Sequence, residues 1–214
     1  MQHYSCMNAP ETKPTLPAVD EELRRATIDV LRERGFSGLT LERVAEVAGR
    51  ARSTIWRQGL SREALVGALV GELAEDFRQT MYPILTSEGS GLDRLTRGLE
   101  ALCDLLDRHL PLLLATDEAF HQETAPGVPP DYLHPFIQFF REGARDGSLP
   151  EAEDEDVVHA ADVAFNALAW PYVHLRGRHE WPAEEAKACV VGVVLHGVSG
   201  PESPAYTSRR KEPR

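Results

Sequence analysis

Four arginines gather in one short segment of this 214-residue chain. Residues 50–62, RARSTIWRQGLSR, hold these arginines together with three serine or threonine hydroxyls and one tryptophan, and they include no acidic residue. Guanidinium groups bind phosphates and the acceptor edge of guanine, and hydroxyl and indole groups donate further hydrogen bonds. The chemistry that this segment favours is the binding of nucleic acid.

Two short helices are predicted to position the segment. Thr40 can cap the first helix with its hydroxyl, and Gly49 ends it. Between them, apolar residues recur at i, i+3, i+4 and i+7 and form one apolar face. They are Leu41, Val44, Ala45 and Ala48. Two short helices around a glycine turn are the pattern of a helix-turn-helix DNA reader.

The second helix is predicted to run from about Ser53 to Gln58. Its start is placed late because Ala51 has no side-chain oxygen to cap it, whereas Ser53 has one. Ile55 and part of Trp56 are the groups that it can bury. The side chains left to face a DNA major groove are Arg52, Ser53, Thr54 and Arg57.

A preceding helix over residues 21–35, followed by Phe36 as a core residue, completes a three-helix unit. With the run Ser61-Arg62-Glu63-Ala64-Leu65 at the start of a fourth helix, these residues resemble the TetR family of bacterial transcriptional regulators. The resemblance covers the whole chain, and its motifs lie between Glu21 and about Val70. It implies a helix-turn-helix domain, a fourth helix that touches both domains, and a helical body that binds a ligand.

The resemblance also implies roles for individual residues. Thr40 would contact a phosphate, residues 52–54 would enter the major groove, and Trp56, which stands where the family usually has tyrosine, and Arg57 would flank the backbone. Arg62 would face a phosphate at the start of the fourth helix. Arg50 departs from the family's apolar residue and is interpreted as an added phosphate contact. The predicted DNA-binding residues are Thr40, Arg50, Arg52, Ser53, Thr54, Trp56, Arg57 and Arg62.

The predicted fold class is all-α, with a helix-turn-helix domain over residues 19–66 and a larger ligand-binding and dimerisation domain over 67–199. Residues 1–18 and 200–214 are proline-rich and are predicted to be disordered tails. Residues 1–66 hold ten basic and nine acidic residues, a net charge of +1, so the total of −11 leaves −12 for the rest. The DNA-facing end is therefore not acidic, although the chain is.

Aromatic and polar residues of the middle helices are candidates for an apolar ligand cavity, or equally for a packed core. The polar members would each need a partner if buried. The candidate ligand-binding residues are Phe77, Met81, Leu102, Leu106, Phe120, His121, His134, Phe139, Asn166 and Trp170. The sequence names no particular ligand.

Two later helices, residues 154–170 and 183–198, have more apolar surface than one core requires. The family resemblance implies that they pair with a second copy in a four-helix interface. The candidate interface residues are Val163, Cys189, Val190, Val193, Val194 and Gly197. A two-fold dimer predicts a palindromic operator. The alternative is that both helices are interior to a monomer.

Other classes of protein have little support. The eight histidines form no His-Glu-x-x-His or paired His/Cys arrangement, and no phosphate-binding loop, nucleophile elbow or Cys-x-x-Cys is present, so no metal, cofactor or enzymatic activity is expected. Three widely spaced cysteines predict reduced thiols rather than disulfides. Without a signal peptide or transmembrane segment, the protein is expected to be cytoplasmic and not bound to membranes.

These observations predict a regulator, most simply a repressor, that binds double-stranded DNA as a homodimer and is released by a small apolar or aromatic effector. The departures at Arg50, Ala51 and Gly59 keep a second hypothesis open, a TetR-like interaction protein with weakened or lost DNA binding. A small helical enzyme is the remote alternative.

Overall fold

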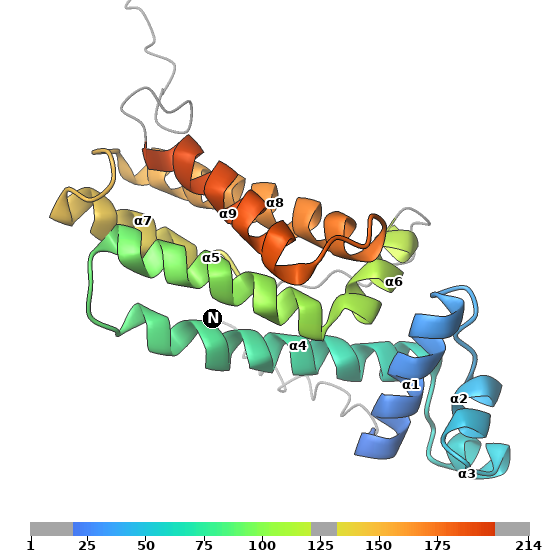
Figure 1. Ribbon diagram of the computed structural model, residues 1–214. Helices are drawn as coiled ribbons and strands as arrows, with labels where there is room; N and C mark the ends of the chain where they lie inside the picture. Colours follow the sequence, from blue (N-terminus) through green and yellow to red (C-terminus); the bar gives the residue numbers. More distant parts are fainter. Residues whose placement is uncertain (1–18, 121–131, 200–214) are drawn as a thin grey trace, which may run out of the picture.

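The computed structural model describes residues 19–120 and 132–199. These residues form nine α-helices and no strand (Figure 1), which confirms the predicted all-α fold class. The helices are α1 (Glu21–Arg34), α2 (Leu41–Val47), α3 (Arg52–Arg57), α4 (Arg62–Leu85), α5 (Gly91–Arg108), α6 (Leu110–Phe120), α7 (His134–Asp146), α8 (Asp154–Gly177) and α9 (Ala183–Ser199). Helices α1 to α3 form a small unit at one end of α4, and α5 to α9 form a larger body along it (Figure 1).

The small unit closes around one apolar core. Leu23 and Val30 of α1, Val44 of α2 and Ile55 of α3 are all buried there, as is Leu65 of α4. Capping fixes where the helices begin. Thr40 caps α2 by accepting a hydrogen bond from the backbone N–H of Arg43 at 3.3 Å, as predicted. For α1 and α2, apolar faces and side-chain caps agree, so local sequence and packing specify the same helices.

The turn and the start of α3 differ slightly from the prediction. Gly49 has a φ of +64°, a left-handed conformation that side chains with a Cβ rarely adopt. Helix α3 begins at Arg52, so the predicted late start at Ser53 is wrong by one residue. Ala51 is the N-cap residue and makes no side-chain capping bond, but its carbonyl oxygen accepts the N–H of Thr54 at 2.9 Å. The backbone therefore closes the first turn without a side-chain cap.

Helix α4 connects the two parts, as expected. Ser61 caps it by accepting the N–H of Ala64 at 3.1 Å, and Thr86 follows its last residue, which confirms the predicted extent from Ser61 to about Thr86. Over this length α4 contributes buried side chains first to the small unit and then to the body, including Leu65, Phe77 and Met81. Any movement of α4 against the body therefore moves the small unit as well.

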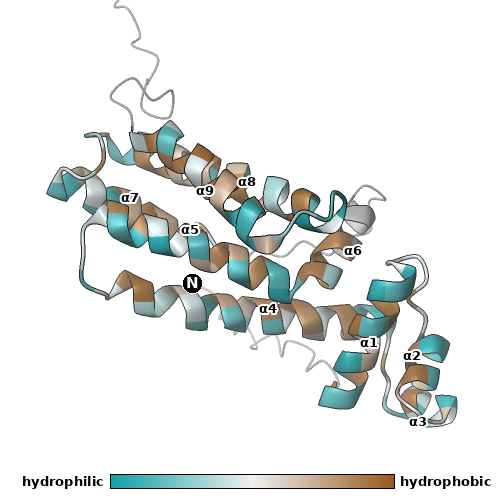
Figure 2. Cartoon of the chain, viewed as in Figure 1, coloured by the Kyte–Doolittle hydropathy of each residue, from teal (hydrophilic) through white to brown (hydrophobic). Residues whose placement is uncertain are grey.

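The body is a stack of helices with an apolar interior (Figure 2). Phe136, Phe139 and Tyr172 are fully buried in it. Gly91 of α5 lies so close to Gly143 of α7 that an added Cβ would come within 2.1 Å of a backbone nitrogen. Helix α8 continues through Pro171 to Gly177, beyond the predicted end at Trp170. None of the described helices is long and apolar enough to cross a membrane.

Candidate nucleic-acid interface

Helix α3 presents most of its side chains to solvent. Ile55 is fully buried and anchors the helix to the small unit. Ser53 and Arg57 are exposed, Thr54 is half-buried, and the Trp56 side chain has 62% of its surface exposed. A tryptophan this open, next to two arginines on a six-residue helix, is unusual for packing and is suited to contact with a large partner.

Arg52 is positioned between an acid and an aromatic ring. Its Nη2 lies 2.5 Å from Oε1 of Glu42 in α2, and its guanidinium carbon is 6.0 Å from the centre of the Trp56 ring. Both members of the ion pair are about half exposed, so water and salt screen their attraction. The pair therefore orients Arg52 over α3. Breaking it, so that Arg52 can contact another group, would cost little free energy.

Arg50 is held by the start of α1. Its Nη1 lies 2.6 Å from Asp20, and its Nη2 lies 2.7 Å from Glu22. Its hydrogen bonds to Asp20 and Glu22 raise the pKa of Arg50, and the bond from Arg50 holds the pKa of the Asp20 carboxyl below its ordinary value. The Arg50 side chain is only 24% exposed. This arrangement joins the α2–α3 turn to α1, so the predicted phosphate contact of Arg50 stays a prediction that must compete with two ion pairs.

Arg62 is turned toward the connection between α1 and α2. Its guanidinium carbon lies 3.8 Å from the centre of the Phe36 ring, and its Nη2 donates a hydrogen bond to the backbone oxygen of Phe36. Its Nε is buried without a hydrogen-bond partner among the described residues. These contacts fix the start of α4 against the small unit. The phosphate contact predicted for the Arg62 side chain stays a prediction.

Thr40 and Arg57 are the more accessible of the predicted phosphate contacts. Both are exposed, and Thr40 uses its hydroxyl oxygen as an acceptor for α2, which leaves the O–H free to donate. Arg57 donates from Nε to the Ser53 backbone oxygen at 3.3 Å. That bond uses one of its five N–H donors, so most of the guanidinium remains available.

Sequence reasoning missed the partners of the arginines. The ion pair of Glu42 in α2 with Arg52 was not predicted. Asp20 and Glu22 precede Arg50 by 30 and 28 residues, and Phe36 precedes Arg62 by 26. No local spacing rule reaches over such separations, because helical patterns relate residues three or four apart. Acidic residues at the start of α1 were the one available signal.

The candidate ligand-binding residues fall into two groups. Phe77, the remaining apolar candidates of α4 and α5, and Phe139 lie in the body core, and the Phe77 ring packs edge-on to Tyr132 at 4.6 Å between centres. His134, Asn166 and Trp170 are exposed, and Asn166 donates to Asp162 in its own helix. The Phe120 side chain and His121 lie outside the described residues. The structure brings together the apolar core group Phe77, Met81, Leu102, Leu106 and Phe139.

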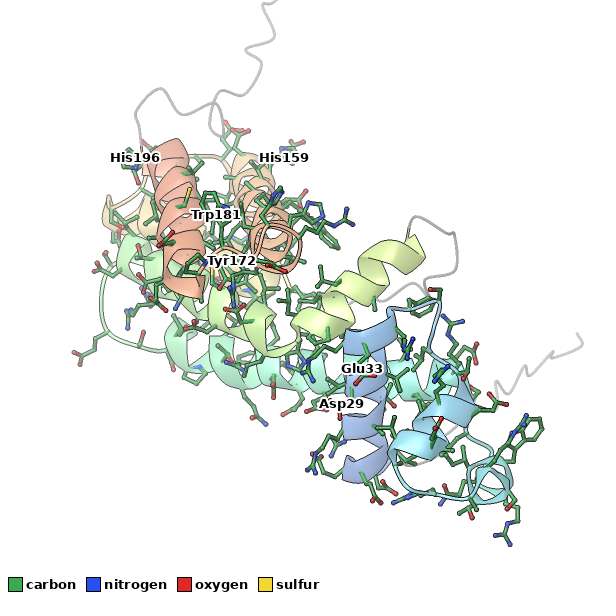
Figure 3. All side chains as sticks on the ribbon, turned by 45° about the vertical axis from the view of Figure 1, so that its right-hand side comes forward. Asp29, Glu33, His159, Tyr172, Trp181 and His196 are labelled. Carbon is green, nitrogen blue, oxygen red and sulfur yellow. The ribbon has the colours of Figure 1, made fainter. Side chains whose placement is uncertain are left out.

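The candidate dimer residues divide by face. Val190 and Val194 are buried within the chain. Val163 of α8 is 57% exposed and Val193 of α9 is 67% exposed, and Cys189 and Gly197 are exposed as well. Trp170 adds an exposed aromatic side chain to α8. The outer sides of α8 and α9 therefore carry apolar groups that no other described residue of the chain covers. His159 of α8 and His196 of α9 lie on the body, away from α1 to α3 (Figure 3).

A partly buried polar network holds α8 against α5. The Tyr172 hydroxyl, inside the body (Figure 3), donates to Oδ2 of Asp107 at 2.6 Å, and Nε of Arg176 donates to Oδ1 of the same carboxylate at 2.7 Å. Burial, and next the hydrogen bond to Asp107, raise the pKa of the Tyr172 phenol. The network satisfies the carboxylate on both oxygens and positions the end of α8 from which α9 begins.

Comparisons with known proteins agree with this architecture. No family model matches the sequence, and no curated protein is detectably similar to it. Solved structures are similar in fold. They include the TetR family transcriptional regulator PfmR from Thermus thermophilus, with 15% identity and a TM-score of 0.66, over 83% of this chain and 98% of that chain. A TetR/AcrR family regulator from Thermobifida fusca has 19% identity and a TM-score of 0.60, over 82% and 96%.

A third similar structure is the transcriptional regulator FadR from Bacillus subtilis in complex with stearoyl-CoA. It has 17% identity and a TM-score of 0.61, and the match covers 83% of this chain and 98% of that chain. All three matches include nearly the whole of the regulator, so both the small unit and the body of this chain have counterparts. The chain thus has the fold of TetR family transcriptional regulators.

Proposed function

We propose that this protein is a cytoplasmic transcriptional regulator, most simply a repressor, that binds a palindromic operator in double-stranded DNA. The observation that carries the proposal is the presentation of α3. Ile55 fixes the helix to a packed three-helix unit, while Arg52, Trp56 and Arg57 extend from it into solvent. Guanidinium groups on a short helix of this kind match the acceptors and phosphates of a major groove.

The proposed regulator is a homodimer. The exposed valines of α8 and α9, Val163 and Val193, would be covered by the same helices of a second copy, in a four-helix arrangement. Two-fold pairing would place the two α3 helices roughly 34 to 36 Å apart, or a multiple of that, on successive major grooves. The match to regulators along nearly their full length supports this arrangement.

The proposed effector is a small apolar or aromatic molecule that binds in the body. Support comes from the aromatic core around Phe77, Tyr132 and Phe136, and from the likeness to a regulator solved with a long acyl chain ligand, stearoyl-CoA. Helix α4 would carry the effect, because it packs in both parts. The effector must bind the released state more tightly than the DNA-bound state, since equal affinity shifts nothing.

One set of contacts favours a second candidate, an interaction protein with weakened DNA binding. Arg50 and Arg62 are engaged within the small unit, and Arg52 is paired with Glu42. If these contacts persist near DNA, Arg57 is left as the principal cation of the interface. DNA binding would then be too weak for specific recognition.

Fluorescence anisotropy on a labelled duplex from the protein's own promoter region, against a scrambled duplex, separates the two candidates. Preferential binding that weakens steeply between 50 and 200 mM salt, as roughly expected for several phosphate contacts, supports the regulator. Equal binding to both duplexes by a folded dimer supports the interaction protein. Addition of apolar effectors to the preformed complex then tests release.

A further inference from the structure

A small cavity lies where the helix-turn-helix unit meets the body. It has a volume of about 160 Å³ and is bounded by α1, by α4 and by the junction of α5 with α6. One side of it is apolar and is formed by Ile28 of α1, Leu69 of α4, and Pro111 and Leu112 of α6. A cavity of about 150 Å³ holds a molecule the size of benzene, so this one suits a ligand with a single small ring or a short branched chain.

The other side of the cavity is polar. Glu72 and Asp76 lie one turn apart on the same face of α4, and Arg108 and His109 face them from the end of α5. The lining contains two carboxylates and one guanidinium, and a second guanidinium, that of Arg24, lies outside the lining at 3.5 Å from Glu72. In a partly enclosed site, desolvation strengthens the attraction between a bound cation and a carboxylate that keeps free acceptor capacity.

The carboxylates of Asp76 and Glu72 differ in how closely neighbouring cationic side chains pair with them. Oδ2 of Asp76 lies 2.8 Å from Nε2 of His109, and Nε of Arg108 is 3.8 Å from the same oxygen. Glu72 instead has a longer ion pair, 3.5 Å to Nη1 of Arg24, and Arg24 makes its short contact of 2.5 Å with Glu21. Both carboxylates are hydrogen-bonded, but the bond to Glu72 is the longer, so Glu72 retains the greater acceptor capacity.

We propose that this cavity binds a small organic cation, with an ammonium group on the Glu72 carboxylate and an apolar group against Ile28, Leu69 and the α6 residues. None of the aromatic rings of Phe77, Tyr132 and Phe136 lines the site, although Leu69 and Leu112 belong to the same apolar core. Its walls come from both parts of the molecule. An occupant adds contacts between α1 and α6, and any effect of this on operator affinity rests on the proposed function above.

The test uses three probes of nearly equal shape with the purified full chain. Benzylammonium carries a positive charge, benzyl alcohol is neutral and benzoate is negative. Isothermal titration calorimetry at low salt is expected to show saturable binding of benzylammonium, and at least about tenfold weaker binding of the other two. Equal binding of all three probes, or no binding of benzylammonium, overturns the proposal. Because the probes are compared on the unaltered chain, no variant needs to fold for this result.

Two substitutions then locate the site. Glu72→Gln removes the charge and is expected to weaken benzylammonium binding by about tenfold. Ile28→Phe fills the cavity and is expected to abolish benzylammonium binding. Glu75→Gln is the matched control, because Glu75 is an exposed carboxylate of the same helix that pairs with Arg78. If Glu75→Gln loses affinity for benzylammonium, or if Glu72→Gln keeps it, the cation binds elsewhere. Because no DNA is present, failure of the proposed regulator function leaves this result unaffected.

Discussion

The guanidinium of Arg62 stacks on the ring of Phe36, with its carbon 3.8 Å from the ring centre, and donates a hydrogen bond to the backbone oxygen of the same residue. This contact joins the first turn of α4 to the connection between α1 and α2. Arg62, one of the arginines of the basic segment, therefore has a structural role, because the angle at which α4 leaves the small unit depends on this contact. The arginines of residues 50–62 are therefore not one uniform phosphate-binding surface.

Arg62→Ala is expected to destabilise the protein. Loss of the cation–π contact and its hydrogen bond should cost about 1 to 3 kcal/mol, which lowers the unfolding temperature by about 2 to 4 °C for each kcal/mol. The salt dependence of DNA binding should be unchanged, because the side chain is turned to Phe36. Thermal unfolding and salt-dependent anisotropy measure the two effects. An unchanged stability together with a shallower salt slope would show that Arg62 acts on phosphate instead.

Arg57→Ala is expected to change the salt dependence of DNA binding and to leave the stability nearly unchanged. Its side chain is exposed, so the free energy of unfolding should stay within about 0.5 kcal/mol of the original. Each dimer loses two phosphate contacts, and the slope of log K against log salt should decrease by about 2. The same anisotropy titrations check this, with Arg78→Ala on the outer side of α4 as control. A slope equal to that of the control would remove Arg57 from the interface.

The contact between Arg50 and Asp20 predicts a dependence on acid. Since Arg50 lowers the pKa of Asp20 below its ordinary value of 3.8, ionised Asp20 stabilises the fold above that pH. This contribution disappears as the pH falls through the lower pKa of the folded state. Asp20→Asn keeps a capping oxygen for Leu23 but removes the charge. Urea unfolding should therefore show a smaller loss of stability from pH 7 to pH 3 in the variant.

The Asp20 experiment has an internal control in Arg50→Ala, which should reduce the same acid-dependent loss. Combining both substitutions should reduce it by less than the sum of the two single effects, because both remove the ion pair between Asp20 and Arg50, whereas only Arg50→Ala removes the pair with Glu22. Additive effects in the double variant would mean that Asp20 and Arg50 contribute through different partners.

Val193→Glu is expected to give a monomer. Val193 is 67% exposed, so the charge costs the isolated chain little, but it would be buried in the proposed interface without a partner. Light scattering after size exclusion should report half the mass of the unaltered protein. Tyr82→Glu, at an exposed residue of α4, is the matched control and should remain dimeric. Dimers in both variants would exclude the outer face of α9 from the interface.

Tyr172→Phe tests the network that holds α8 to α5. It removes the hydrogen bond to the Asp107 carboxylate, which should cost about 1 to 3 kcal/mol. The pKa of the Tyr172 phenol is raised in the folded protein. The stabilisation by its hydrogen bond to Asp107 is therefore complete below the ordinary tyrosine pKa, and it is lost as the pH rises beyond that value. Chemical unfolding at pH 7 and pH 11 should therefore show a larger difference between the two proteins at pH 7. Tyr82→Phe supplies an exposed control.

Much of the fold could be predicted from the sequence, because the signals are local. The capping hydroxyls of Thr40 and Ser61, the glycine at position 49 and the apolar faces of short helices act within one or two turns. Three helices, the turn between two of them and the long α4 follow from these signals. Resemblance to a family supplied the order of the parts, and the structure agrees with it.

Local signals also determined that Arg52 and Arg57 are exposed, since Ile55 is the buried anchor of so short a helix. What the tertiary structure decided is which arginines are already engaged. Arg50 pairs with Asp20, and Arg62 donates a hydrogen bond to Phe36, across 30 and 26 residues of chain. Such contacts depend on how packed helices orient their ends, which no spacing of residues along one helix contains. The sequence by itself therefore determined the helix-turn-helix unit and its composition, and the packing of α1 against the turn and α4 decided which charges remain for a partner.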